Sequence, residues 1–213
     1  MKAMILAAGR GERMGELTKS TPKPLLKVAG KYLIEYSLAA CRASGIHDVI
    51  INVSYLAEQI QSTLGDGARY GLCITYSVEA ERLETGGGIV KALPFFAGEP
   101  FLVISSDIIT DFPLQTLLKP ISHLAHLVLV KNPLFHQAGD FGMINGYVDL
   151  HAKPTLTFAN IGVYHPDLFL HATASRFPLN QLLFPAINKQ LVTAEEYHGR
   201  WFNVGSPEEL AKV

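Results

Sequence analysis

Residues 2–14 read Lys2-Ala3-Met4-Ile5-Leu6-Ala7-Ala8-Gly9-Arg10-Gly11-Glu12-Arg13-Met14. The first part of this stretch, residues 2–7, is a predicted strand, and a loop with two glycines follows it at once. The apolar run is short and arginines follow directly, so it predicts neither an export signal nor a membrane span. The pattern therefore predicts a buried first strand that ends in a glycine-rich turn.

Up to about residue 122, apolar runs that predict strands alternate with stretches that have helical spacing. Apolar runs and helical spacing predict further strands at 48–53, 72–77 and 101–105, and helices at 32–44, 56–64 and 88–95. Continuous runs such as Val49-Ile50-Ile51 suit strands that are buried on both faces. Strands that alternate with helices favour βαβ units and right-handed crossovers. We therefore expect an α/β fold with a mostly parallel sheet flanked by helices.

After residue 123 the predicted strands and helices no longer alternate regularly. The pattern predicts strands at 125–130, 147–150 and 155–164, a helix at 179–188, an extended segment at 201–204 and a closing helix at 207–213. No linker or repeat interrupts the chain. We therefore expect one domain over residues 1–213, with a nucleotide-binding core at 1–122 and a more irregular half at 123–213.

Composition narrows the class of protein. The chain has 213 residues, of which 48% are hydrophobic and 17% charged, so a packed core is expected. The formal net charge of -1 gives no electrostatic basis for binding nucleic acid. Two cysteines without a C-x-x-C pattern indicate a reduced interior. No run is long enough to span a membrane, and we expect a cytoplasmic protein; the oligomeric state stays open.

The loop after the first predicted strand has the features of a phosphate-binding loop. Ala7, Ala8, Gly9 and Gly11 are small enough for the backbone N–H groups to approach a triphosphate, and Arg13 adds a fork of phosphate donors. A dinucleotide-binding fingerprint needs a third glycine where Met14 stands, and a P-loop also fails there. An NAD(P)-dependent oxidoreductase is therefore disfavoured.

Two further residues complete the predicted phosphate site. Lys23 is flanked by Pro22 and Pro24, which should hold it in an extended loop beside the first motif. Asp107 follows the predicted strand 101–105, where a carboxylate can hold Mg²⁺. Because ligands of parallel sheets bind beyond the carboxyl ends of the strands, we expect the segments that begin at Ala7, Leu83 and Asp107 to form one site.

The chain resembles the sugar-1-phosphate nucleotidylyltransferase family. The resemblance begins with residues 6–26, which match the family signature L-A-[AG]-G-x-G-[TE]-R-[ML] followed by [TS]-x-P-K-P-[LM]-[LV]. Further matches span nearly the whole chain in family order: Leu33-Ile34-Glu35-Tyr36, Gly65-Asp66-Gly67, Leu83-Glu84-Thr85-Gly86-Gly87-Gly88, Gly139-Asp140-Phe141 and residues 201–206.

The resemblance implies a Rossmann-like fold, a sugar-binding half at residues 123–213, Mg²⁺ as cofactor and no organic cofactor. The implied reaction is in-line attack of a sugar 1-phosphate on the α-phosphorus of a nucleoside triphosphate, with release of pyrophosphate. UTP and N-acetylmuramate 1-phosphate are the implied substrates; transfer to mannose 1-phosphate or glucose 1-phosphate is the alternative.

The resemblance also implies roles for individual residues. Arg13, Lys23 and Asp107 carry the catalytic roles, and Asp107 with Asn203 holds the metal. Glu79 and Gly87 join the phosphate loop in binding the nucleotide, the glycine by offering bare backbone to the base. The residues implied for the sugar are Glu84, Thr85, Asp140 and Asn160.

The chain departs from the family pattern at Ser106, where the family usually has glycine before the metal aspartate, and mainly at Asn203. The segment 201–206 matches W-x-D-[IV]-G-[TS] except that Asn203 stands in place of the aspartate. An amide oxygen still suits a hard cation but removes one negative charge from the site. Weaker Mg²⁺ binding is therefore expected, and a sugar-nucleotide-binding protein without catalytic activity is a second hypothesis.

Overall fold

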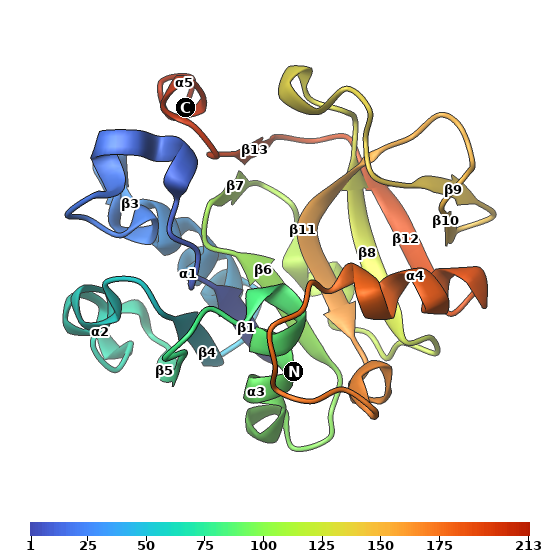
Figure 1. Cartoon of the computed structure of the whole chain (residues 1–213), viewed down its shortest axis with the longest axis horizontal. Coiled ribbons are helices and arrows are strands. Elements are labelled where there is room, and N and C mark those ends of the chain that lie inside the picture. The colour runs from blue at the N-terminus through green and yellow to red at the C-terminus, as the bar shows by residue number, and fades with distance from the viewer.

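The computed structural model describes residues 1–213 and is built on one nine-stranded sheet (Figure 1). The strand order is β5-β4-β1-β6-β11-β8-β12-β10-β9. In that order the strands are β5 (Cys73–Val78), β4 (Asp48–Val53), β1 (Lys2–Leu6), β6 (Phe101–Ser105), β11 (Thr157–Tyr164), β8 (Ala125–Val130), β12 (Val192–Tyr197), β10 (Tyr147–Asp149) and β9 (Gly142–Ile144).

Two small sheets and five α-helices complete the fold. The pairs are β2 (Lys27–Val28) with β3 (Lys31–Tyr32), and β7 (Ile108–Thr110) with β13 (Trp201–Asn203). The α-helices are α1 (Leu33–Ala43), α2 (Ala57–Leu64), α3 (Glu84–Phe96), α4 (Asn180–Asn188) and α5 (Pro207–Leu210). None of these helices is both long and apolar enough to cross a membrane.

The sheet has two halves with different strand directions. Strands β5, β4, β1 and β6 all run parallel, as the alternating pattern predicts. From β6 onward the pairing is mostly antiparallel, with β11 between β6 and β8, and only β8 and β12 pair in parallel. The prediction of a mixed, largely parallel α/β sheet is confirmed, and its irregular half is the second one.

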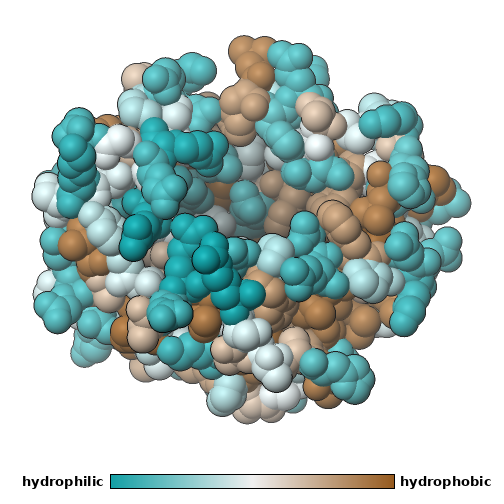
Figure 2. Space-filling model, in the orientation of Figure 1, coloured by the Kyte–Doolittle hydropathy of each residue, from teal (hydrophilic) through white to brown (hydrophobic).

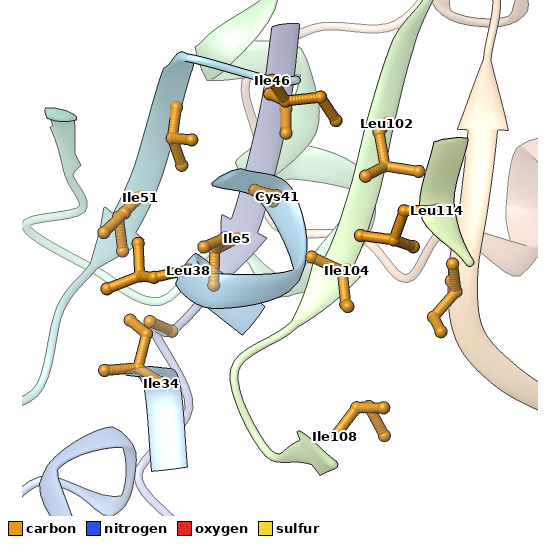
Figure 3. Close-up of a cluster of buried hydrophobic side chains, with 14 of the residues drawn as sticks. Ile5, Ile34, Leu38, Cys41, Ile46, Ile51, Leu102, Ile104, Ile108 and Leu114 are labelled. Carbon is orange, nitrogen blue, oxygen red and sulfur yellow. The ribbon is translucent and has the colours of Figure 1, made fainter. Parts of the chain in front are cut away.

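Each face of the sheet packs against its own helices, because alternate strand residues point to opposite sides. Ile5 contributes to one core cluster together with Leu38 and Cys41 of α1, as Figure 3 shows. Met4 contributes to the opposite cluster, which contains residues of α3 and α4. Burial raises the pKa of the Cys41 thiol to about 12, so this side chain packs as an inert apolar group.

Helix α3 and strand β12 differ most from the elements that the sequence predicts. Helix α3 begins at Glu84, so the three glycines at 86–88 lie inside the helix and not in the loop before it. Strand β12 at residues 192–197 has no predicted counterpart, although it pairs with all of β8. The cause in both cases is tertiary packing, which the local pattern does not contain.

Candidate active site

A polar cavity of about 540 Å³ lies at the carboxyl ends of the parallel strands. Leu6 ends β1, Asn52 is near the end of β4, Ser105 ends β6, and Glu79 follows β5; all four residues line this first cavity. Ligands of open parallel sheets bind at this edge. Figure 2 shows a hollow near the middle of this face, with strongly hydrophilic residues on one side and more hydrophobic ones on the other.

The predicted phosphate-binding loop forms one wall of the first cavity. Residues 6–13 all line it. Gly11 has φ +66°, and a Cβ atom there would lie 2.9 Å from Cβ of Lys23, so both the backbone angle and the close approach require glycine. Thr18 closes the turn by donating from Oγ1 to the Gly11 carbonyl oxygen at 3.0 Å. The loop is thus fixed against the segment that carries the lysine.

Lys23 and Asp107 form an ion pair inside the first cavity. The lysine Nζ lies 2.5 Å from Oδ2 of the aspartate, and the two side chains are only 12% and 22% exposed. Lys23 begins a short 3-10 turn, residues 23–25, because Pro24 is tolerated in the first turn. The extended conformation predicted for this lysine is therefore wrong, but the structure brings together the two predicted residues across 84 positions of sequence.

Glu79 lines the first cavity and is only 3% exposed, and both of its carboxylate oxygens accept hydrogen bonds from the protein. Oε1 accepts from Asn52 Nδ2 at 2.8 Å, and Oε2 accepts from the Leu83 N–H at 2.9 Å. Sequence reasoning missed Asn52, although one polar residue near the end of a continuous apolar strand is a usable signal.

The glycines of α3 face protein rather than open space. A Cβ atom at Gly87 would lie 1.9 Å from the Ser175 carbonyl oxygen, and one at Gly86 would lie 2.3 Å from the Phe177 ring. Gly87 lines neither of the cavities described here. The structure therefore does not provide the bare backbone expected at Gly87; this residue is small because residues 175–177 pack on the helix.

A second cavity of about 420 Å³ adjoins the first and shares Leu6, Arg13, Thr85 and Ser105 with it. The remaining lining comes mostly from the second half of the chain: Val103, Phe135, His136, Asp140, Phe141, Thr157, Phe158, Asn160, Tyr164, Leu179, Asn180, Leu183 and Asn203. Of the residues predicted for the sugar, Thr85, Asp140 and Asn160 are here. Glu84 is not: it lines the first cavity and pairs with Arg176 at 2.9 Å.

Two polar groups of the second cavity are fixed by their surroundings. Asp140 accepts a hydrogen bond from the Phe158 N–H at 2.8 Å through Oδ2, and its Oδ1 lies 2.9 Å from His136 Nε2. Asn160 has φ +57° where the register between β11 and β8 shifts. Asparagine tolerates this left-handed conformation, and such bulges re-aim side chains. Sequence reasoning missed His136, for which no spacing signal exists.

Asn203 and Asp107 lie on neighbouring backbone segments, and Asp107 lines the first cavity while Asn203 lines the second. Asn203 pairs with Ile108 in the β13–β7 ladder, and the N–H of Val204 donates to the Asp107 carbonyl oxygen at 3.0 Å. The side-chain Oδ1 of Asn203 is buried and has no hydrogen-bond partner. An unpartnered buried carbonyl oxygen and the carboxylate of a neighbouring segment are oxygen donors of the kind that a hard cation prefers. No cluster of three acidic, histidine or cysteine side chains surrounds them.

The parallel sheet, its phosphate loop and the adjoining cavity define an α/β nucleotide-binding protein with room for a second ligand. Within this class the chain belongs to the nucleotidyl transferase family, whose model matches residues 2–213. The predicted family and enzyme class, a nucleotidyltransferase, are thereby confirmed.

Two relatives match nearly the whole chain. The N-acetylmuramate alpha-1-phosphate uridylyltransferase of Neisseria meningitidis serogroup B is 42% identical, over 97% of this chain and 94% of its own length. A mannose-1-phosphate guanyltransferase of Gibberella zeae is 31% identical, over 99% of this chain and 62% of its own length. The first of these relatives thus has nearly the same extent as this chain.

Solved structures share the fold at low sequence identity. A Bacillus anthracis protein crystallised with sucrose superposes with a TM-score of 0.88 at 20% identity, covering 100% of this chain and 93% of that one. The inositol-1-phosphate CTP transferase from T. maritima superposes with a TM-score of 0.81 at 16% identity, covering 98% of this chain and 90% of that one. These likenesses confirm the fold class.

Proposed function

We propose that this nucleotidyltransferase transfers the uridylyl group of UTP to N-acetylmuramate 1-phosphate, forming a UDP-sugar and pyrophosphate in cell-wall sugar recycling. The observation that carries the reaction is the pair of adjoining cavities that share Arg13, with the Lys23–Asp107 ion pair in the first of them. The choice of substrates rests on the 42% identity with the Neisseria uridylyltransferase. A nucleoside triphosphate substrate also supports a cytoplasmic location.

The nucleotide is proposed to occupy the first cavity. Backbone N–H groups of residues 7–11 would donate to the triphosphate, and Arg13 would add charged donors. Glu79 would face the base. All lining residues except Pro178 and Gly205 come from the first 122 residues, which supports the division into a nucleotide-binding core and a sugar-binding half.

The sugar 1-phosphate is proposed to occupy the second cavity. Asp140 and Asn160 would contact its hydroxyl groups, while Thr85 lies where both cavities meet. Aromatic and aliphatic residues that line this cavity, such as Phe158, suit the apolar faces of a sugar ring and an N-acetyl group. Half-polar lining of this kind fits a substituted sugar better than a second nucleotide.

In this reaction the protein contributes mainly the positioning of the substrates and the neutralisation of their charge. A phosphate oxygen of the sugar forms a bond to the α-phosphorus of UTP while the bond from that phosphorus to the bridging oxygen breaks, and pyrophosphate leaves with the electron pair. The attacking phosphate is already anionic at neutral pH, so no general base is needed. Lys23 is proposed to hold the α-phosphate against the incoming phosphate, and Arg13 to hold the departing pyrophosphate.

Asp107 and Asn203 would hold Mg²⁺, since their oxygens are the donors that this ion prefers. Bound Mg²⁺ neutralises triphosphate charge and withdraws electrons from the α-phosphoryl group. With one carboxylate and one amide, the protein supplies a single negative charge, which Lys23 offsets in the free enzyme. The phosphates of the substrate would therefore supply much of the attraction for the cation.

Pyrophosphate release tests the proposal directly. Purified protein with Mg²⁺ is given UTP, GTP, CTP or dTTP together with N-acetylmuramate, glucose or mannose 1-phosphate. We expect release above background mainly with UTP and N-acetylmuramate 1-phosphate. Release with GTP and mannose 1-phosphate instead would move the substrate assignment to the alternative. Binding of a UDP-sugar without release by any pair would favour a non-catalytic protein with a weakened metal site.

A further inference from the structure

Asn52 links the phosphate loop to a buried acidic residue that lines the nucleotide cavity. It pairs with Leu6 in the β1–β4 ladder and is 3% exposed. Its Oδ1 accepts a hydrogen bond from the N–H of Ala7 at 2.9 Å, and its Nδ2 donates to Glu79 Oε1 at 2.8 Å. The amide orientation is therefore set by the loop, because only the oxygen end can accept from Ala7.

Helix α3 closes the other side of this pair. The second carboxylate oxygen of Glu79 accepts from the N–H of Leu83, directly before the helix. A Cβ atom at Gly88 would lie 2.7 Å from Glu79 Oε1 and 3.0 Å from Asn52 Nδ2. The third glycine of the motif therefore leaves room for the Asn52–Glu79 pair. Both hydrogen bonds to this carboxylate act together to hold it in one position.

The pair gives the cavity a defined chemical preference. Both Asn52 and Glu79 line the first cavity, and Glu79 accepts a hydrogen bond through each of its carboxylate oxygens. The Watson–Crick edge of uracil offers an N3–H donor, whereas the corresponding N3 of cytosine is an acceptor. A fixed buried acceptor pairs with the N3–H of uracil but finds no donor at N3 of cytosine. Such an unpaired buried group gives strong discrimination between the two bases.

We propose that Asn52 is a positioning residue for base selection, which holds Glu79 toward a nucleobase N–H and ties that group to the phosphate loop. This inference rests on the proposed function, since it assumes that the first cavity takes the nucleotide. It predicts that the enzyme favours UTP over CTP through the orientation of one carboxylate, and that Asn52 acts without touching the reacting phosphates.

A double-variant cycle tests the proposal. Asn52→Asp keeps the acceptor for Ala7 but turns a second carboxylate toward Glu79. Glu79→Gln replaces one of the two acceptor oxygens with an NH2 group. That donor then faces another donor, either Asn52 Nδ2 or the Leu83 N–H. In the double variant the introduced glutamine amide can donate to the introduced carboxylate and still accept from the Leu83 N–H, so both hydrogen bonds return. We expect KM for UTP to rise about 30-fold in each single variant and to recover at least tenfold in the double variant.

The readout separates positioning from general stability. KM for the sugar 1-phosphate should change less than about threefold in all variants, while the ratio of kcat/KM for UTP over CTP falls at least tenfold in Asn52→Asp. Gly88→Ala perturbs the pair from the helix side without changing a hydrogen-bonding group, and should lower the same ratio. Tyr36→Phe, which removes one hydrogen bond to Val28 away from both cavities, should leave the ratio unchanged.

Several outcomes would overturn the inference. An unchanged UTP-to-CTP ratio in soluble, folded Asn52→Asp would do so, as would equal losses in the KM of both substrates. Wild-type enzyme that prefers CTP would contradict it as well. If the wild type releases no pyrophosphate with any pair, the proposed function fails, and calorimetric binding of UTP and CTP to the same variants still tests the base preference.

Discussion

The two cavities are neighbours, but the chain builds them in different ways. The first is lined by 20 residues of which 3 are hydrophobic, and the second by 17 of which 8 are hydrophobic. The first uses short continuous motifs at strand ends, and the second gathers single side chains from loops, β11 and α4. The contrast teaches that a polar cavity can be built from short local motifs, whereas a half-apolar cavity is assembled from distant parts of the fold.

Loss of the lysine in the first cavity should have the largest effect. Lys23→Ala removes the cation that is proposed to hold the α-phosphate and leaves Asp107 without its ion-pair partner, so kcat should fall about 1000-fold. Pyrophosphate release under saturating substrates measures this effect. Lys27→Ala is the matched control, because Lys27 is exposed four residues away and lines neither cavity. Wild-type turnover in Lys23→Ala would contradict the role given to this residue.

The affinity for Mg²⁺ should rise when residue 203 gains a negative charge. Asn203→Asp adds a second carboxylate to the proposed metal site, so the Mg²⁺ concentration for half-maximal rate should fall about tenfold. Binding of Mn²⁺ to the protein, followed by electron paramagnetic resonance, gives a readout that does not depend on turnover. Unchanged affinity for both ions would mean that Asn203 is not a ligand.

A change in the second cavity should alter KM for the sugar 1-phosphate and leave KM for UTP nearly unchanged. Asn160→Gly removes the side chain but keeps a residue that accepts φ +57°, so the backbone bulge should survive. We expect KM for the sugar 1-phosphate to rise about tenfold, while KM for UTP changes less than about twofold. Steady-state kinetics with each substrate varied in turn measure the split. A rise confined to UTP would reverse the assignment of the cavities.

The smallest effect on activity should come from a change at Gly87, which lines neither cavity. Gly87→Ala places a Cβ atom 1.9 Å from the Ser175 carbonyl oxygen, so residues 175–177 must shift. Overpacking of this kind costs about 2 kcal/mol of unfolding free energy. Chemical denaturation measures it, and KM for UTP should change only slightly. A large rise in that KM with unchanged stability would instead support the direct contact with the base.

The parallel core could be predicted from the sequence almost to the residue. Strands β4 and β6 have the predicted bounds because each is dominated by a run of apolar residues, Val49–Ile51 in β4 and Phe101–Ile104 in β6. Helix α3 was predicted to start too late because glycines weaken the local helical signal. Its glycines are explained only by what packs on them, which the sequence alone does not reveal.

The candidate site divides in the same way. Arg13, Lys23 and Asp107 lie in recognisable motifs, and the structure brings all three to the first cavity. Asn52 and His136 have no motif, since their positions depend on which strand and loop reach the cavity. Charge at a strand end is a local signal, whereas lining a cavity is a property of the folded chain.

A crystal structure of the protein with a non-hydrolysable UTP analogue, Mg²⁺ and N-acetylmuramate 1-phosphate tests the two-cavity account most directly. The account predicts the uracil beside Glu79, the triphosphate along residues 7–13, and the sugar ring beside Asp140 and Asn160, with both phosphates meeting near Lys23. A nucleotide whose base lies in the second cavity, or a sugar phosphate bound outside it, would contradict the account.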